Sequence, residues 1–193
     1  MQPEQLLSIL STAARLKTTP RHCFTEGDRR ESVADHSWRV SLMAMLLADE
    51  PEFAQIDINR VVRMCLIHDL GEAFTGDIPT FLKTEQDGAV EDDLYAQWVA
   101  TFPEPTRAHW RALLSEMEAL ETPEAKLYKA LDKLEAVIAH NESDIATWLP
   151  LEYDLQLTYG TKETRFSPTL VRLKEAIDEW TRRKIHEESE LEK

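Results

Sequence analysis

Three polar side chains interrupt an apolar stretch in the first half of the chain, and their types suit metal chemistry. The run from 58 to 74 predicts a helix that is apolar nearly all round and is therefore buried. His68, Asp69 and Glu72 lie within it. Because unpaired buried charge costs several kcal/mol, these groups must be paired, hydrogen-bonded or bound to a metal ion.

The spacing of these side chains indicates two different roles, metal binding and proton transfer. His68 and Asp69 are adjacent and can offer one cation an imidazole nitrogen and a carboxylate oxygen, whereas Glu72 follows one helical turn later, where it can handle protons. The turn residues after Phe74 end the helix and bring a further carboxylate, Asp77, to the mouth of the same site. Most His-Asp pairs are ordinary surface or core pairs, so the rest of the chain must supply further ligands.

A second region with a candidate ligand is the helix expected from residue 33 to about residue 48. Ser32 and Asp35 have the spacing of a capping box, which predicts where this helix begins. His36 interrupts the apolar stripe of the helix. The ordinary alternative for His36 is a hydrogen-bonded core histidine.

A third helix is expected from Pro123 to about His140, with Thr122 as its N-cap. Asp132 lies beside the apolar stripe of this helix, and its ordinary alternative is a solvated acid. Two imidazoles and two carboxylates would suit a first-row divalent ion (Mn, Fe, Co or Zn), with positions left for water and substrate. The four candidate ligands are His36, His68, Asp69 and Asp132.

The composition of the chain favours one helical domain. It has 193 residues and only 5 glycines, with long stretches rich in Ala, Leu, Glu and Lys. A net charge of −14 argues against broad binding to nucleic acid or anionic membranes, and no signal peptide or membrane-length apolar run is present. Cys23 and Cys65 form no CxxC pattern, which indicates reduced thiols in a cytoplasmic protein. We expect an all-α, single-domain helical bundle over 1–186 and a charged, frayed tail over 187–193.

Further helices are expected around these three. Residues 4–17 predict an amphipathic helix with Leu6, Leu7 and Leu10 facing inward. The polar segment 20–31 predicts an irregular loop, and its excess of basic residues is either a phosphate seat or a solvated surface. Residues 80–88 are expected to be polar and mobile. The remaining helices are expected over 89–101, 106–120, 143–158 (one or two short helices) and 168–185.

Three motifs together carry a resemblance to a known family. They are ESVADHSWRV (31–40), IHDLGEAFTGDIP (67–79) and ALDKLEA (130–136), with LKTTPR (16–21) upstream. The order His…His-Asp…Asp on a helical scaffold resembles the HD-domain metal-dependent phosphohydrolases. The continuation EAFTGDIP resembles one branch of them, the small bacterial 5′-deoxynucleotidases and their archaeal and eukaryotic relatives.

The resemblance implies roles for individual residues. Glu72 and Asp77 would be needed for turnover, and Arg21 would face the substrate phosphate. In the bacterial enzymes an aromatic residue follows this arginine and packs near the sugar. In this chain His22 follows the arginine, and this arrangement is more similar to that of the eukaryotic and archaeal relatives. Phe24 is the aromatic candidate for substrate binding. The metal ligands implied by the resemblance are His36, His68, Asp69 and Asp132.

The chemistry that fits these residues is hydrolysis of a phosphomonoester by water that a divalent metal ion activates. The metal and Arg21 would neutralise the phosphate, Glu72 would act as general acid–base with a raised pKa, and Asp77 would bond a sugar hydroxyl or order the water. We therefore expect a nucleoside 5′-monophosphatase that prefers 2′-deoxy substrates. From 5 tryptophans and surplus apolar helix faces we also expect a homodimer.

Two alternatives remain open from the sequence. One is another HD-type phosphohydrolase that acts on a triphosphate, a cyclic nucleotide or a non-nucleotide phosphate. The other is a non-catalytic nucleotide-binding module. All the residues that catalysis would need are present, which favours an enzyme.

Overall fold

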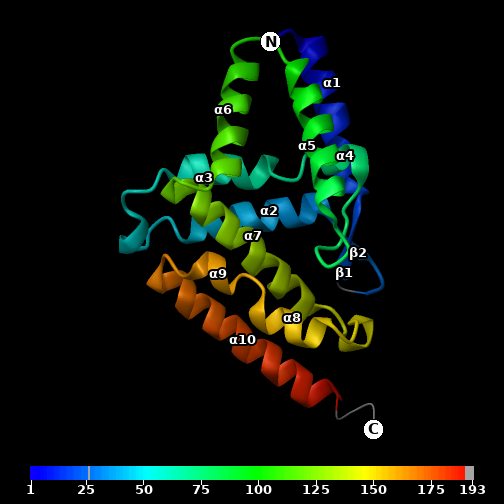
Figure 1. Cartoon of the computed structure of the whole chain (residues 1–193), viewed down its shortest axis with the longest axis vertical. Helices are drawn as coiled ribbons and strands as arrows, with labels where there is room; N and C mark the ends of the chain where they lie inside the picture. Colours follow the sequence, from blue (N-terminus) through cyan, green and yellow to red (C-terminus); the bar gives the residue numbers. More distant parts are fainter. Residues whose placement is uncertain (26, 190–193) are drawn as a thin grey trace.

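Three helices form the centre of the molecule, and they are the three that were expected to carry metal ligands. In the computed structural model, which describes residues 1–25 and 27–189, α2 (Val33–Leu46), α3 (Ile58–Ile67) and α7 (Pro123–Glu142) pack against one another pairwise. α10 (Pro168–Ser189) covers the outer side of α7 (Figure 1). The prediction of an all-α bundle is confirmed, apart from a two-stranded sheet.

The other elements surround this centre. α5 (Glu85–Ala100) and α6 (Thr106–Ala119) form a helical pair that projects to one end of the molecule, where α1 (Pro3–Ala13) also lies, and α10 lies toward the opposite end (Figure 1). None of the helices in the described ranges is long and apolar enough to cross a membrane. The remaining short elements are η1 (Ala14–Lys17), β1 (Pro20–Phe24), β2 (Arg30–Ser32), η2 (Pro51–Phe53), α4 (Glu72–Thr75), η3 (Ile145–Thr147), α8 (Glu152–Thr158) and α9 (Thr161–Thr164).

Local capping begins two of the central helices where the sequence predicted. The Ser32 hydroxyl accepts the Asp35 N–H at 3.1 Å, and the Asp35 carboxylate accepts the Ser32 N–H at 2.9 Å, so the capping box is confirmed. At the start of α7 the Thr122 hydroxyl accepts the Ala125 N–H at 3.1 Å. These caps set the helical phase that turns His36 and Asp132 toward the interior.

The expected long helix over 58–74 is wrong in its second half. α3 ends at Ile67, and a turn precedes the short α4. The Ile67 carbonyl accepts the Tyr95 hydroxyl at 2.8 Å, so α5 satisfies a helix end that carries no local stop signal. A Cβ on Gly71 would lie 2.8 Å from Cγ of Glu91, so glycine allows the close approach of α5 to this turn.

A β-hairpin replaces the irregular loop expected over 20–31. β1 and β2 pair antiparallel, with Pro20 opposite Ser32 and Phe24 opposite Arg30. β1 packs against α7, which brings residues 21–23 to the same region as the ligand-bearing helix. The hairpin escaped prediction because its strands are short and polar, without the alternation of apolar side chains that identifies a half-buried strand.

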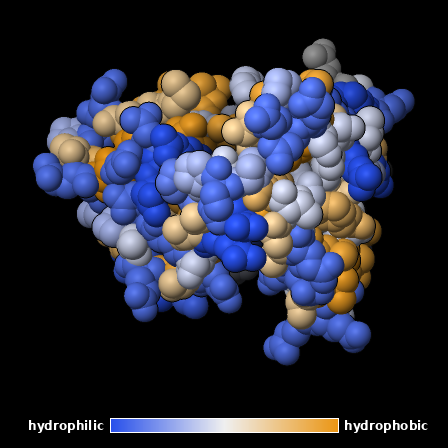
Figure 2. All heavy atoms as spheres, turned by 90° about the horizontal axis from the view of Figure 1, so that it is seen from above, coloured by the Kyte–Doolittle hydropathy of each residue, from blue (hydrophilic) through white to orange (hydrophobic). Residues whose placement is uncertain are grey.

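Smaller differences concern helix faces and ends. Leu6, Leu7 and Leu10 of α1 are exposed, whereas Ile9 of α1 and Leu16 of η1 face the core instead. Seen from above, apolar patches accordingly interrupt the hydrophilic surface (Figure 2). α5 begins earlier than expected, because Thr84 caps it. α10 continues to Ser189, three residues into the expected tail, and 190–193 lie outside the described residues.

Candidate active site

Four side chains from α2, α7 and the turn that follows α3 converge on one point. His36 Nε2 lies 3.2 Å from His68 Nε2 and 3.3 Å from Asp132 Oδ1. Asp69 Oδ2 lies 3.0 Å from His68 Nε2 and 3.6 Å from His36 Nε2. Ligand atoms bound tetrahedrally at ~2.0–2.1 Å from an ion such as Zn²⁺ lie ~3.3 Å apart. The spacing of these four groups therefore fits one ion among them.

The far sides of both imidazole rings strengthen this conclusion. His68 Nδ1 faces the Cys65 carbonyl at 2.9 Å, and His36 Nδ1 faces the carboxylate of Glu135. Both partners only accept, so each Nδ1 carries the hydrogen, and in a neutral ring each Nε2 presents a lone pair. Two lone pairs this close repel one another unless a metal ion or a proton lies between them. Burial opposes protonation of His68, but Asp69 and Asp132 outweigh it and raise its pKa to about 10, so without a metal ion this ring holds the proton.

Both carboxylates of this cluster are ionised. Burial opposes ionisation of Asp69, but the neighbouring His68 holds its pKa well below the ordinary value. Burial likewise opposes ionisation of Asp132, and Lys129, whose Nζ lies 2.9 Å from Oδ2, outweighs it and lowers the pKa. Asp132 is buried, so the alternative of a solvated acid is wrong.

Glu135 contacts the cluster on the side away from the cavity, and no pattern in the sequence distinguishes it from other helical acids. Its side chain is fully buried and contacts His36, Arg21 Nη1 at 3.3 Å and Arg39 Nε at 2.6 Å. Burial disfavours its charge, but His36 and the two arginines lower its pKa to about 2. Arg39 of α2 also contacts Glu31 and Glu142.

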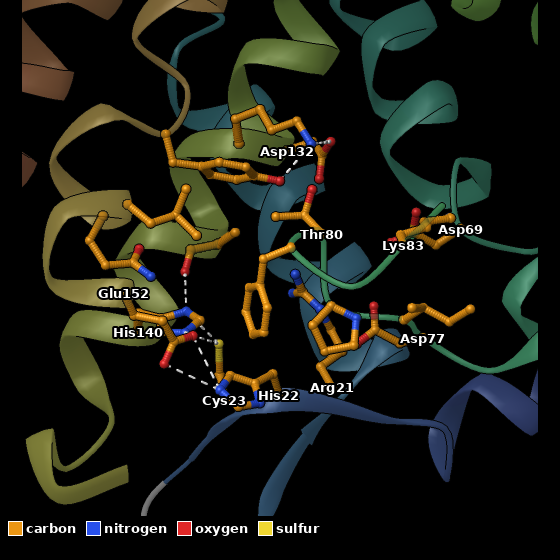
Figure 3. Close-up of a pocket in the computed structure, with 18 of the residues that line it drawn as sticks. Arg21, His22, Cys23, Asp69, Asp77, Thr80, Lys83, Asp132, His140 and Glu152 are labelled. Atoms are coloured by element: carbon orange, nitrogen blue, oxygen red, sulfur yellow. Dashed lines mark hydrogen bonds and ion pairs between the residues drawn. The ribbon is translucent and has the colours of Figure 1, made fainter. Parts of the chain in front are cut away.

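A cavity opens beside the cluster of candidate metal ligands (His36, His68, Asp69 and Asp132). Cationic side chains line the end of the cavity next to this cluster. Arg21 of β1, Lys83 before α5, and Lys129 and Lys133 of α7 line it together with Asp69 and Asp132 (Figure 3). Lys83 is held by Glu91 at 2.6 Å, and Lys133 donates to the Tyr159 hydroxyl at 2.6 Å. Four cationic side chains around one opening form a seat for an anion such as phosphate. Of these four, the sequence singled out Arg21 alone.

Glu72 lies at the edge of the same cavity with an unsatisfied oxygen. Its side chain is buried, and Oε2 has no hydrogen-bond partner. Burial, together with the nearby charges of Asp69, Asp77 and Glu91, raises the pKa of Glu72 to about 10. Glu72 is therefore a protonated carboxylic acid at neutral pH, with one oxygen free to act on a ligand.

Asp77 also lines the cavity, at the end of the turn that follows α4. Gly76, which precedes it, has φ +79°, a conformation that side chains disfavour, and this turn directs the chain back toward the cavity. Burial raises the pKa of Asp77, with Arg21 opposing that shift.

Phe24 does not lie with the other candidate residues. Its ring stacks on Arg30, whose guanidinium carbon lies 4.8 Å from the ring centroid, and Phe24 does not line the cavity. The aromatic rings in the cavity wall belong to His22, Phe81, His140 and Tyr159, and His22 and Phe81 meet edge to face. Phe81 lies in the segment 80–88, which was expected to be polar and mobile. Because its sequence neighbours are polar, Phe81 was not identified as a candidate residue.

Known proteins similar to this chain share its length and its fold. The family model described as HD domain matches residues 13–174. The 5′-deoxynucleotidase HDDC2 of Homo sapiens is 31% identical over 173 residues, which cover 87% of this chain and 82% of that protein. The 5′-deoxynucleotidase hdd1 of Schizosaccharomyces pombe is 29% identical and covers 68% of this chain and 69% of its own length.

Two solved structures extend the comparison. A protein from Magnetospirillum magnetotacticum MS-1, described as a predicted metal-dependent phosphohydrolase, is 30% identical with a TM-score of 0.76, covering 94% of this chain and 95% of that one. The HD phosphohydrolase DatZ of cyanophage S-2L, bound to dA and one catalytic Zn²⁺ ion, is 25% identical with a TM-score of 0.54, covering 92% and 96%.

Proposed function

This chain belongs to the HD-domain family and is a metal-dependent phosphohydrolase, and on that premise we propose that it removes the 5′-phosphate from deoxynucleoside 5′-monophosphates. One observation carries the proposal: the cation-lined cavity opens directly beside the cluster of metal-ligating side chains. A phosphate seated on these cations would lie next to that cluster. The names of the relatives, 5′-deoxynucleotidases and an HD phosphohydrolase bound to dA, supply the substrate class.

We propose that one divalent ion binds through two imidazole nitrogens and two carboxylate oxygens. The donor set suits Zn, Mn, Fe or Co. When bound, such an ion lowers the pKa of a water molecule and neutralises phosphoryl charge. The proposed ligands are His36, His68, Asp69 and Asp132.

Around this ion, the side chains of the cavity divide the work of hydrolysis. Arg21 and the three lysines hold the phosphate and neutralise its charge as the transition state forms. Water attacks phosphorus, the bond from phosphorus to the 5′-oxygen breaks, and Glu72 gives its proton to that oxygen. The proton lost by the attacking water restores Glu72. Asp77, beside the phosphate seat, accepts a hydrogen bond from a sugar hydroxyl.

A phosphate-release panel tests this function. Deoxynucleoside 5′-monophosphates should be hydrolysed at similar rates whatever their base, with ribonucleotides and 3′-phosphates slower. Activity on triphosphates or cyclic nucleotides, without activity on monophosphates, would show a different HD-type phosphohydrolase. Absence of phosphate release with Zn, Mn, Fe and Co alike would show a nucleotide-binding module.

Two broader predictions accompany the proposal. We propose that the protein works in the cytoplasm, where its two buried cysteines, Cys23 and Cys65, stay reduced. We also propose a homodimer, since α2 exposes Trp38, Met45 and Leu46. Sedimentation at micromolar concentration tests the second prediction, and a single monomeric species would contradict it.

A further inference from the structure

A second cluster of polar side chains lies in the wall of the same cavity and has no part in the reaction proposed above. His22 and Cys23 come from β1, His140 from the last turn of α7 and Glu152 from the first turn of α8. Figure 3 shows these four side chains together, across the cavity from Asp69 and Lys83. The sequence did not indicate that these four residues lie together, because they come from three separate segments.

Glu152 is the centre of this cluster. Its side chain is fully buried, and Oε2 accepts the Leu149 N–H at 2.7 Å, which fixes the orientation of the carboxylate. Oε1 then faces two imidazoles, with His140 Nε2 at 2.8 Å and His22 Nε2 at 3.2 Å, and His22 Nε2 also lies 3.3 Å from Oε2. A buried carboxylate oxygen thus has two ring nitrogens directed at it.

The hydrogen-bond partners of His140 indicate which of its ring nitrogens carries the hydrogen. Its Nδ1 lies 3.2 Å from the Ala136 carbonyl and 2.9 Å from Cys23 Sγ. Because a carbonyl only accepts, Nδ1 carries the hydrogen, and in a neutral ring Nε2 presents a lone pair to the carboxylate of Glu152. That contact is repulsive unless a positive charge lies between them. His68 faces the Cys65 carbonyl in the same way at the first metal-ligand cluster.

We propose that His22, His140 and Glu152 bind a second divalent transition-metal ion, through the two Nε2 atoms and Oε1. The three donor atoms lie within 4.8 Å of one another. Two imidazoles and one carboxylate form a donor set typical of zinc and non-haem iron. Mg²⁺ and Ca²⁺ prefer oxygen ligands, so they are not the expected ions at a site with two imidazoles. The competing occupant is a proton on His140, which would leave a hydrogen-bonded ion pair.

The second ion would have a defined place relative to the substrate. Three protein ligands leave coordination positions open, and these would face the cavity that all three ligands line. If the phosphate occupies the cation-rich end, as the proposed function holds, the open positions face the part of the substrate remote from the phosphate. Metal binding itself does not depend on that function, so metal content and phosphate release test the two proposals separately.

Metal content of variants tests the second site. Full-length protein is loaded with Zn²⁺ or Co²⁺, freed of loosely bound ions by gel filtration and analysed for metal per chain. We expect about two ions per chain in the wild type, and about one in Glu152→Gln and in Asp69→Ala. The double variant should retain none. A Glu152→Gln protein with the same metal content as the wild type would overturn the proposal, as would a wild type whose whole metal content Asp69→Ala removes.

Three further variants control this experiment. His109→Ala removes an exposed histidine on α6 and should keep both ions. Cys23→Ser should also keep both, because Sγ approaches the Nδ1 side of His140 and lies 4.0 Å from Nε2; loss of an ion here would move ligation to the thiolate and overturn the donor set. If Glu152→Gln fails to fold by circular dichroism, His22→Gln replaces it, since the His22 side chain is 22% exposed whereas that of Glu152 is fully buried. His22→Gln protein that retains two ions would refute the site.

Discussion

His36 and His68 place their Nε2 atoms 3.2 Å apart, while the Nδ1 atom of each ring is held on the far side by an acceptor. Neutral imidazoles with these tautomers cannot satisfy each other, because each Nε2 presents a lone pair. A positive charge between the two rings satisfies the contact, and the first prediction is that a metal ion supplies it.

Asp69→Ala should abolish binding of the ion at this cluster and lower the stability of the apoprotein little, since Asp69 supplies charge rather than packing. Isothermal titration with Zn²⁺ or Mn²⁺ measures the loss. Asp93→Ala, on the surface of α5, is the matched control and should bind as the wild type does. Unchanged affinity at the cluster in Asp69→Ala would contradict the assignment of Asp69 as a ligand.

Glu72→Gln should retain the metal and the fold but lower kcat by about 10²–10⁴, the scale expected for loss of a general acid–base. Glu118→Gln, an exposed acid of α6, should leave kcat unchanged. Full activity in Glu72→Gln would make Glu72 a structural residue.

The pH profile of the wild type provides a separate test of Glu72. Because the pKa of Glu72 is raised to about 10 and the protonated form donates, kcat should fall as the pH rises through that pKa. A bound cation favours the carboxylate and moves this alkaline limb to lower pH. Glu72→Gln should lack the limb, and a limb of unchanged position in that variant would assign it to another group.

Arg21→Ala should raise KM for every nucleotide alike, since the guanidinium binds the phosphate that all of them share. Loss of a charged hydrogen bond costs ~1.5–3 kcal/mol, which corresponds to ~10–150-fold. The KM of Arg21→Lys should lie between those of the wild type and Arg21→Ala, because lysine keeps the charge but cannot bind the phosphate in a bidentate manner. Arg63→Ala, an exposed arginine of α3, is the control. A KM that changes for one base alone would place Arg21 away from the phosphate.

Asp77→Asn should erode the preference for 2′-deoxy over ribose substrates while leaving the indifference to the base intact. The carboxylate lies in the cavity beyond the Gly76 turn, where a sugar hydroxyl would meet it. The ratio of kcat/KM for paired deoxy and ribo monophosphates measures the effect. If that ratio is unchanged while both rates fall together, Asp77 orders water and does not read the sugar.

Thr122→Ala should lower the free energy of unfolding by ~1 kcal/mol, because the hydroxyl caps α7 and also donates to Glu116 at 2.6 Å. For a chain of this size the melting temperature should fall by ~2–4 °C. Ser11→Ala, an exposed serine of α1, should shift it much less. Equal melting temperatures for Thr122→Ala and the wild type would show that Pro123 starts the helix without the cap.

The sequence predicted the parts of this protein that local patterns encode. Ser32 and Thr122 set the starts of α2 and α7, and the apolar stripes of these helices put His36 and Asp132 on interior faces. Asp69 then joins them from the turn after α3. The geometry that brings these side chains together could therefore be anticipated, whereas their role as ligands stays a prediction.

The rest of the site depends on contacts between distant segments. Glu135 looks like an ordinary helical acid in the sequence, and only the packing of β1 and α2 against α7 surrounds it with Arg21, Arg39 and His36. The end of α3 at Ile67 likewise depends on a hydroxyl from α5. Local periodicity carries no information on such partners, so the long helix was predicted wrongly.

The separation of the metal-ligating groups along the chain has a thermodynamic consequence. His36 and His68 are 32 positions apart, and His36 is 99 positions from the Glu135 that holds it. Most of these groups do not meet in the unfolded chain, so the proposed ion should bind the native state far more tightly. By mass action, free ion at ~100 times its dissociation constant then adds ~2.7 kcal/mol to the free energy of unfolding. A chelator should remove this contribution and lower the melting temperature of the protein.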